Sequence, residues 1–367
     1  MGISCKYCCG RNCQQSLNEL NYFNPPKINK NIFSIDDFFK LIPEEIFIKM
    51  QKEKFPAHKN QAYLKTEKIL VDNNSNSEYE DNKKEIFYHG EYNEQNQRDG
   101  VGKMIIQNNK EKIFYHGIWH NDNLNEGYIY YEDGSVYKGD IKDYMRDGKG
   151  KYITNNYKYD GDWKEDQKGG DGSLTFKDGT KYIGEFKKDK FNGKGKMEWK
   201  DGYYYDGNFM NSFFHGKGYL RMNNGHIYNG NFQYGAFHGE GEFKWINGMS
   251  LEFYKGNYSY GKKDGKGEFH FENGNIYKGE WKSGNPDGEG IFETNNRKYF
   301  GNWRAGMFMQ LIEVEDKEEA KEENLNLTFK VPTEDIFILD HISTSVNTSI
   351  SVRSSEAEMS IEYIKND

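Results

Sequence analysis

A tyrosine followed two residues later by a glycine recurs ten times in this chain, and its spacing restricts the fold more than any other feature of the sequence. Successive tyrosines are 22 to 27 residues apart. They are Tyr88, Tyr115, Tyr137, Tyr159, Tyr182, Tyr205, Tyr228, Tyr254, Tyr277 and Tyr299. A period of this length is typical of a repeat protein, in which each unit packs mainly against its neighbours.

Each unit has the pattern of a β-hairpin. The tyrosine, the glycine at offset 2 and the residue at offset 4, which is aromatic in nine units, lie on one face of a strand because side chains alternate with period two. From the third to the ninth unit, glycines at offsets 11 and 13 repeat this on a returning strand, as at Gly148 and Gly150. We expect a loop of about six residues inside each hairpin and tight Asp-Gly or Asn-Gly turns between units.

The glycines also predict how the hairpins pack. Glycine weakens a strand unless something bulky approaches the backbone, so we expect these glycines to seat the rings at offsets 0 and 4. Single hairpins are marginally stable, so stacking is expected to hold them together. Twenty strands about 4.8 Å apart correspond to a ribbon of roughly 90–100 Å before twist. The seventh unit has 26 residues and is expected to have an enlarged turn near Met249–Phe253.

The combination of Tyr-x-Gly-x-aromatic with Asp-Gly-x-Gly, as in YKGNYSYGKKDGKG at residues 254–267, resembles the membrane occupation and recognition nexus (MORN) repeat. The resemblance covers residues 88–303 and implies a mainly β fold: an elongated, single-layer antiparallel ribbon of about ten stacked hairpins, used as a scaffold near membranes and cytoskeleton. Three departures are interpreted as atypical ends or caps. Gly100 and Gly102 come one place late, Gly127 has no partner glycine, and the tenth unit stops after Trp303.

The composition agrees with a thin aromatic core. Only 35% of the 367 residues are hydrophobic, 28 are Tyr and 25 are Phe, and the mean hydropathy is -1.02. The net charge of -8 argues against a nucleic-acid partner. No stretch approaches the ~20 apolar residues of a membrane-spanning helix, and the N-terminus has no secretory signal. We therefore expect the chain in the cytosol or on cytoplasmic membrane surfaces.

Residues 1–30 read as an acylated leader. The sequence MGISCKYCCGRNC contains all four cysteines of the chain, and Gly2 follows the initiator methionine as N-myristoylation requires. Palmitoylation at Cys5, Cys8 or Cys9 would add the second anchor that stable attachment needs. Lys6 stands where the acylation motif has Ser or Thr. A zinc site and a plain disordered leader are the alternatives, although the cysteines are crowded for a zinc site and no histidine accompanies them.

The flanks of the repeats have different characters. Residues 31–56 are predicted to form a short helical cap, with Ser34 as an N-cap and Pro43 opening a second helix. We interpret this segment as a cover for the first strand of the ribbon, and a partner-binding helical pair is the alternative. Residues 57–87 are predicted to be a polar linker. Residues 304–367 are predicted to be an acidic and Ser/Thr-rich tail, partly disordered.

Nothing in the sequence indicates an enzyme. No glycine-rich phosphate-binding motif is complete, and every Gly-x-Gly lies between strands. The scattered histidines, His215 and His238 among them, are interpreted as turn residues. Neither flank has room for a catalytic domain of about 100–200 residues. We predict no catalytic residue, no metal and no cofactor.

The function predicted from these observations is a non-enzymatic scaffold, tethered by its leader to the cytoplasmic face of a membrane such as the cell cortex. Its partner is expected to be a helix, a peptide, a cytoskeletal protein or another copy of the chain. The candidate groove consists of the aromatic residues at offset 4, because aromatics are favoured in recognition surfaces. They are Trp119, Trp163, Phe186, Phe209, Phe232, Tyr258, Trp281 and Trp303. The alternative is that these rings fill the core of the ribbon.

Three other functions stay open at this point. Lysine-rich loops favour direct binding of phosphoinositides or other anionic lipids. These lysines are Lys187, Lys188, Lys190, Lys262, Lys263 and Lys266. A structural role in a cilium or axoneme is the second, and a relative of phosphatidylinositol-phosphate kinases that lacks the kinase part is the third.

Overall fold

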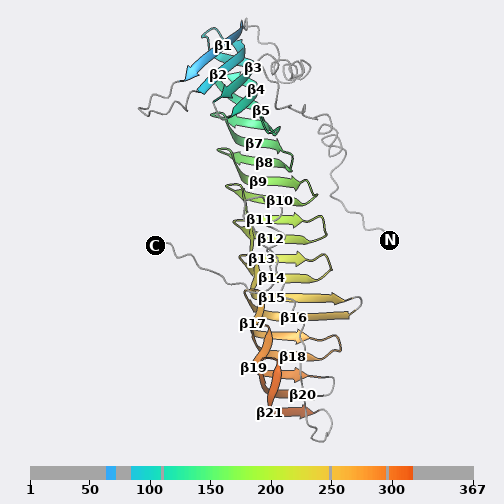
Figure 1. Cartoon of the computed structure of the whole chain (residues 1–367). Helices are drawn as coiled ribbons and strands as arrows, with labels where there is room; N and C mark the ends of the chain where they lie inside the picture. Colours follow the sequence, from blue (N-terminus) through green and yellow to red (C-terminus); the bar gives the residue numbers. More distant parts are fainter. Residues whose placement is uncertain (1–62, 72–83, 109–110, 248–249, 295–296, 317–367) are drawn as a thin grey trace, which may run out of the picture. The chain divides into compact units, whose positions relative to one another are not determined.

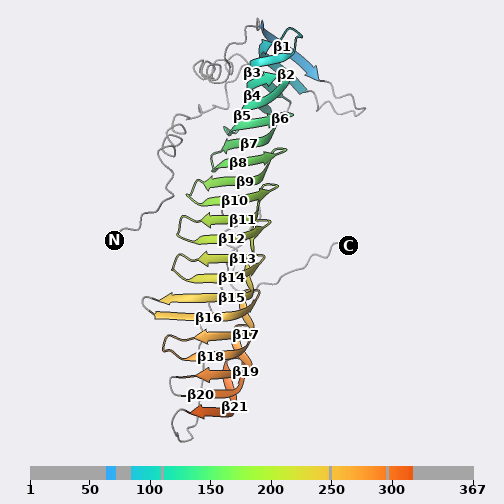
Figure 2. The same ribbon diagram turned by 180° about the vertical axis from the view of Figure 1, so that it is seen from behind.

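The computed structural model describes residues 63–71, 84–108, 111–247, 250–294 and 297–316. All regular structure in these ranges consists of β-strands, β1 to β21 (Figures 1 and 2). The described residues divide into two compact units. One contains the residues up to Ser212 together with Gly216–Asn229, and the other contains Phe213–His215 and the residues from Gly230 onward.

In the first unit each strand pairs antiparallel with the next along the chain, from β1 to β12. The strands are β1 (Tyr63–Val71), β2 (Lys84–Tyr92), β3 (Arg98–Gln107), β4 (Lys112–His120), β5 (Asn123–Tyr131), β6 (Val136–Lys142), β7 (Met145–Ile153), β8 (Tyr157–Lys164), β9 (Gln167–Phe176), β10 (Lys181–Lys187), β11 (Lys190–Glu198) and β12 (Tyr204–Met210). The predicted antiparallel sheet of successive β-hairpins is confirmed.

The second unit repeats this arrangement from β15 to β21. Its strands are β15 (Ala236–Asn247), β16 (Ser250–Ser259), β17 (Lys262–His270), β18 (Ile276–Lys282), β19 (Asn285–Glu293), β20 (Arg297–Arg304) and β21 (Met307–Asp316). Strands β13 (Phe213–Arg221) and β14 (Ile227–Gln233) contribute residues to both units.

A column of glycines crosses the strands, because the glycines at offsets 2 and 13 are direct cross-strand partners. Gly139 pairs with Gly150 within one hairpin, and Gly150 pairs with Gly161 of the next. Gly127, the single glycine on the returning strand of the second unit, pairs with Gly117 on one side and with Gly139 on the other, so it lies in the same column. The second glycine of this unit is absent, as the sequence indicated, and Asn125 stands two residues before Gly127 in its place.

The turns inside the hairpins are shorter than the sequence predicted. Asp143 and Tyr144 form a two-residue turn between the paired residues Lys142 and Met145, with φ of 51° and 62°. Positive φ at both positions matches the twist of the flanking strands, so no six-residue loop is needed. The predicted Asp-Gly turns between units are confirmed. Gly134 has a φ of 85°, and its N–H donates to the carbonyl of Tyr131 (3.0 Å).

The seventh unit accommodates its extra residues in its strands and not in an enlarged turn. Strand pairing between β15 and β16 continues to Asn247 and Ser250, so residues 250–253 belong to β16. Figure 1 shows this hairpin reaching beyond β17 and β18. An antiparallel ladder can lengthen at the hairpin end without disturbing its register, which explains how the additional residues are absorbed.

The repeats extend past both predicted boundaries. Strand β1 lies within the predicted linker 57–87 and pairs along its whole length with β2. Strand β21 lies within the predicted tail 304–367 and completes the tenth hairpin, with Trp303 opposite Phe308. Both strands lack the repeat's glycines, but backbone hydrogen bonding to an edge strand does not require them. The leader 1–30, the cap 31–56 and the rest of the tail lie outside the described residues.

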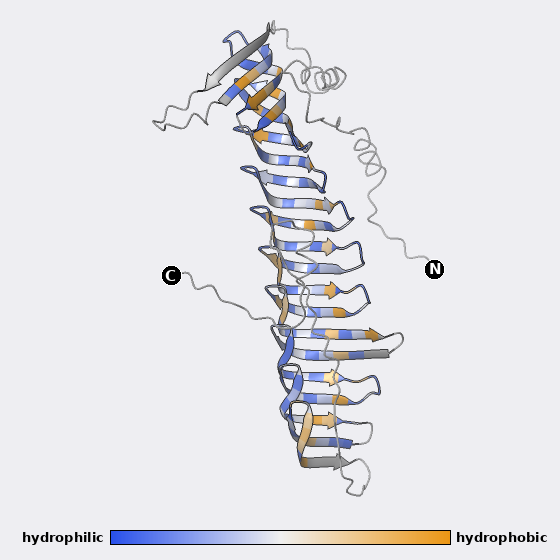
Figure 3. Cartoon of the chain, in the orientation of Figure 1, coloured by the Kyte–Doolittle hydropathy of each residue, from blue (hydrophilic) through white to orange (hydrophobic). Residues whose placement is uncertain are grey.

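The core lies on the face that carries the repeated tyrosines. In β10 the exposure alternates residue by residue, with Tyr182 and Phe186 buried and Lys181 and Lys187 exposed. Figure 3 shows the same interleaving, with apolar and hydrophilic residues following one another along single strands. We call the tyrosine-bearing side the inner face of the sheet and the opposite side the outer face.

Candidate functional site

The repeated tyrosines occupy the glycine column. The Tyr159 ring lies over Gly172, where a Cβ atom would come within 2.5 Å of the phenol oxygen. Its hydroxyl donates to the carbonyl of Asp162 (2.8 Å), and the same bond to the residue three positions on recurs in six further units. Burial raises the pKa of the Tyr159 phenol, which keeps the hydroxyl a hydrogen-bond donor. The prediction that glycines seat aromatic rings is confirmed for the repeated tyrosines at offset 0.

The aromatic residues at offset 4 link one unit to the next. Trp163 meets Tyr137 of the preceding unit edge-to-face at a ring separation of 5.5 Å, and Phe186 meets Tyr159 at 5.1 Å. Edge-to-face pairs of this kind contribute about 0.5–1.5 kcal/mol beyond the burial of their area.

The candidate groove is therefore closed. Its residues are Trp119, Trp163, Phe186, Phe209, Phe232, Tyr258, Trp281 and Trp303, and each is between 1% and 5% exposed. Side chains this deeply buried fill the core, as the alternative interpretation held, and do not form an open recognition surface. The sequence could not distinguish the two, because a ring on one face of a strand fits either role.

The aspartate of Asp-Gly-x-Gly connects neighbouring units, a role that the sequence analysis missed. Asp147 accepts hydrogen bonds from the backbone N–H of Glu165 (3.2 Å) and from Lys164 Nζ (3.0 Å), both in the next hairpin. Asp287 accepts in the same way from the N–H of Ala305 (3.0 Å). The sequence did contain a signal for this role, because aspartate recurs before the glycine and a carboxylate is a strong acceptor for turn N–H groups.

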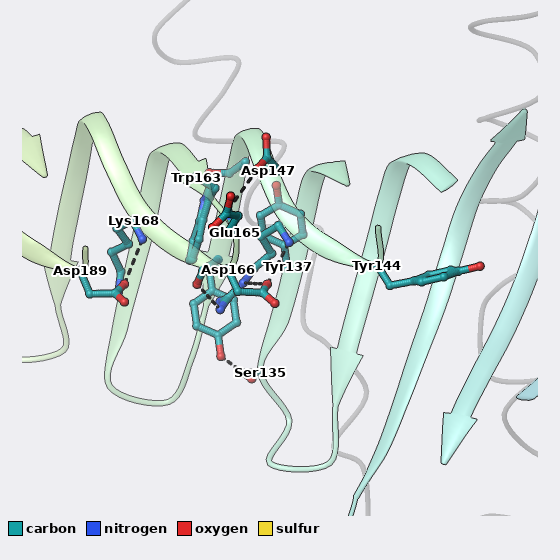
Figure 4. A network of polar contacts seen from close by, with 12 residues as sticks. Ser135, Tyr137, Tyr144, Asp147, Trp163, Glu165, Asp166, Lys168 and Asp189 are labelled. Carbon is teal, nitrogen blue, oxygen red and sulfur yellow. Dashed lines mark hydrogen bonds and ion pairs between the residues drawn. The ribbon is translucent and has the colours of Figure 1, made fainter. Parts of the chain in front are cut away.

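Arg146 is a largely buried cation that lies among aromatic rings. Its partners Trp163 and Asp166 are labelled in Figure 4. Its guanidinium carbon lies 4.1 Å from the centre of the Trp163 ring and 4.9 Å from that of Tyr152. Nε donates to Asp166 Oδ1 (2.9 Å), and the same oxygen accepts from the Arg146 backbone N–H (2.9 Å). The aromatic ring faces and the Asp166 carboxylate stabilise the positive charge of Arg146 in place of the water that the guanidinium loses on burial.

Lysines take this position in two other units. Lys168 Nζ lies 5.0 Å from the centre of the Tyr157 ring and 3.3 Å from Asp189 Oδ1, and burial lowers the pKa of the Lys168 ammonium. Lys263 is 7% exposed, with its Nζ 4.9 Å from the Trp245 ring centre and 5.5 Å from that of Trp281. Lys263 is therefore withdrawn from any lipid surface, which corrects its place among the candidate lipid-binding lysines.

Some of the other residues that the sequence singled out lie within the described part of the chain, and others lie outside it. His215 and His238 lie in strands β13 and β15, which corrects their assignment to turns. Each ring packs edge-on against a tyrosine at 5.5 Å: His215 against Tyr234 and His238 against Tyr260. In the described ranges, no three His, Cys, Asp or Glu side chains gather in a way that could hold a metal ion.

The predicted lipidation residues Gly2, Cys5, Cys8 and Cys9 lie outside the described residues. The described part of the chain also contains no helix with the length and apolarity needed to cross a membrane.

Stacked hairpins that share a glycine column and exchange rings with their sequence neighbours define an all-β repeat protein. The family model described as MORN repeat matches seven consecutive segments of the chain. They are residues 137–157, 159–181, 182–202, 205–227, 228–250, 254–276 and 277–297. This chain is a MORN repeat protein. A comparison with curated proteins found no match. MORN repeats indicate a scaffold for protein or membrane interaction, and this fold is generally non-catalytic.

Proposed function

We propose that this MORN repeat protein is a non-enzymatic scaffold, held at the cytoplasmic face of a membrane by its acylated leader and presenting its repeats to a cortical or cytoskeletal protein. One observation supports the scaffold role above all. The recurring residues of the repeat are engaged in holding the sheet together, with tyrosine in the glycine column, the second aromatic in the core and aspartate on the next turn. Recognition then falls to residues that differ from one repeat to the next.

Exposed aromatic rings on such variable positions are the best candidates for the partner surface. Tyr234 and Tyr260 are the first residues of two hairpin turns and are 57% and 73% exposed, and Phe213 is also exposed. Aromatic side chains are enriched at protein interfaces, where they bury a large area at a small cost in conformational entropy. These three residues replace the closed groove as the candidate contact with a protein partner.

The membrane anchor rests on the sequence of the leader. A myristoyl chain on Gly2 alone gives marginal, reversible binding, whereas palmitate on Cys5, Cys8 or Cys9 adds a second anchor and makes attachment stable. The two modifications therefore have separable effects. Loss of the myristoylation site should release the protein, because palmitoylation of such leaders follows a first transient contact with the membrane. Loss of the cysteines should leave weak and reversible association.

The test images the fluorescently tagged full chain in cells beside G2A and a C5S/C8S/C9S variant, with incorporation of alkyne-labelled myristate and palmitate as the chemical readout. We expect myristate label to disappear in G2A, palmitate label to disappear in the cysteine variant, and membrane signal to fall in both. Unchanged membrane signal in both variants would contradict the anchor.

A second arm separates anchoring from direct lipid recognition. Full-length protein made without acylation is mixed with vesicles that contain anionic lipid or a phosphoinositide. We expect no co-flotation, because the chain is acidic overall and Lys263 is buried. Binding in this arm would favour the lipid-headgroup function instead, through the exposed Lys187, Lys188 and Lys190.

A further inference from the structure

The outer face of the sheet is buried at strands β3 to β5, although it is open elsewhere in the same unit. On β10 the outer-face residue Ile183 is 61% exposed, and its cross-strand partner Lys196 on β11 is exposed as well. On β3 to β5 the corresponding side chains are almost inaccessible. They are Val101 (2%), Ile105 (0%), Phe114 (4%), His116 (0%), Tyr128 (5%) and Tyr130 (9%).

These six residues form one continuous patch, which we call the β3–β5 outer patch. The strand register places Ile105 opposite Phe114 and Phe114 opposite Tyr130, and it places His116 opposite Tyr128. Neighbouring strands cannot cover their own face, because the same pairing leaves Ile183 open on β10. A second layer must therefore lie on this patch, as expected for strands that are apolar on both faces.

We propose that residues 31–56 of the same chain form this second layer. The first support is reach. Strand β1 begins at Tyr63 and lies two strands from β3, through β2. Neighbouring strands are about 4.8 Å apart, so β3 to β5 lie roughly 10–20 Å from β1. Six residues such as 57–62 can span up to about 20 Å, so the segment can reach the patch.

The second support is chemical complementarity. The segment supplies apolar side chains for the patch, Phe38, Ile42 and Ile46 among them. Its first part, residues 31–48, also carries four acids against one lysine, Lys40; the acids are Asp36, Asp37, Glu44 and Glu45, and Glu53 lies further on among Lys49, Lys52 and Lys54. The outer face bears positive charge beside the patch, at Lys103 (9% exposed) and at the exposed Lys138, whose strand partner is Tyr128. The acidic and apolar first part of the segment, residues 31–48, complements both features of this surface.

This inference changes what the N-terminal segment covers. The sequence alone favoured a cover for the edge of the first strand, but β1 already occupies that edge by pairing with β2. The segment instead covers a sheet face, two to four strands further on. The inference does not depend on acylation and is tested on unacylated full-length protein, so its failure leaves the membrane anchor untouched.

The first experiment measures side-chain accessibility by hydroxyl-radical footprinting of the full chain. In an I42D/I46D variant we expect oxidation of Tyr128 and Tyr130 to rise about fivefold or more, since an uncovered sheet face is solvated. Oxidation of the inner-face residue Tyr182 should not change. The matched control, I336D/I338D, places the same substitutions in the apolar part of the C-terminal tail. A rise at Tyr128 in that control instead would assign the patch to the tail and overturn the proposal.

The second experiment needs no substitution. Zero-length carbodiimide coupling joins lysines to carboxylates that touch, and peptide mapping locates the bonds. We expect coupling of Lys103 or Lys138 to Asp36, Asp37, Glu44 or Glu45. A mixture of isotopically light and heavy chains shows whether each bond lies within one copy. Bonds between copies would mean that a second copy covers the patch, and bonds to acids beyond residue 316 would mean that the tail does; either result overturns the proposal.

Discussion

Strands β3 to β5 and strands β10 to β12 both carry a tyrosine-covered glycine on the inner face but differ on the outer face. Tyr88 of β2 lies over Gly102 of β3, and Tyr182 of β10 lies over Gly195 of β11. On the outer side, β3 to β5 bury Ile105 and His116, whereas β10 leaves Ile183 exposed. The repeat therefore determines the side chains of one face only. The other face is free to take a second layer, a charged surface or a partner.

The largest difference between the two regions should appear when the same residue type is truncated on each outer face. Ile105→Ala removes a fully buried side chain, and we expect it to lower the free energy of unfolding by about 3–4 kcal/mol. Ile183→Ala removes an exposed side chain and should change it by less than about 0.5 kcal/mol. Urea unfolding with hydrogen exchange of β3 and β10 amides measures both. Equal costs would mean that the two outer faces are alike.

The inner face should respond equally in β3 and in β9, the strand that pairs with β10. A Cβ atom added at Gly102 or Gly172 meets a tyrosine ring and its hydroxyl, so we expect each alanine substitution to cost about 2–3 kcal/mol. Gly169 lies in the same strand as Gly172, and a Cβ atom there has its nearest neighbour at 3.8 Å. Gly169→Ala is therefore the matched control and should be close to neutral. An unchanged free energy of unfolding in Gly172→Ala would contradict the packing of the Tyr159 ring on this glycine.

The buried histidine makes the covered region sensitive to acid. Burial, and then the charge of Lys103, lowers the pKa of His116 from 6.5 to about 4. The unfolded chain takes up this proton below about pH 6.5 and the folded chain only near pH 4. The contribution to stability is therefore complete above pH 6.5 and is lost as the pH falls. We expect the free energy of unfolding to drop by about 2 kcal/mol between pH 7.5 and pH 5.

Two variants isolate this effect. His116→Phe should remove most of the pH dependence, measured by hydrogen exchange in β4 at both pH values. His120→Asn, at an exposed position of the same strand, should leave it intact. A pH dependence that persists in His116→Phe would assign it to other groups.

Most of the fold could be predicted from the sequence because the same pattern, a tyrosine followed two residues later by a glycine, recurs in every unit. Glycine two residues after tyrosine fixed the inner face, the register of the glycine column and the antiparallel order of the strands. The turns inside the hairpins were misjudged. Asp143 and Tyr144 resemble loop residues, and the pattern cannot show that both adopt positive φ.

The features that were not predicted lie at positions where the sequence does not follow the repeat pattern. Strands β1 and β21 lack the glycines and join the sheet through backbone bonds, which leave little trace in sequence. The two-sided burial of β3 to β5 did leave a signal, in the continuous apolar runs around Ile105 and Phe114. The candidate groove failed for another reason: alternation places a ring on a face, but only the structure shows whether that face is covered.

The smallest expected effect concerns the aspartates that link consecutive units, at Asp99 in β3 and at Asp147 in β7. Asp99, the second residue of β3, accepts from the Asn121 N–H (3.2 Å), as Asp147 accepts from that of Glu165. Without the carboxylate, the turn N–H has only water as its hydrogen-bond partner. Asp99→Ala and Asp147→Ala should therefore each lower the free energy of unfolding by about 1 kcal/mol. Asp160→Ala, which breaks only the exposed ion pair with Lys151, should cost less than about 0.5 kcal/mol.

Because these aspartates join consecutive units, removing either carboxylate should also speed hydrogen exchange in the turn of the following unit. Hydrogen exchange in the turn of the preceding unit should not change. Equal protection of both turns in Asp147→Ala would mean that the aspartate acts within its own unit and does not couple the repeats.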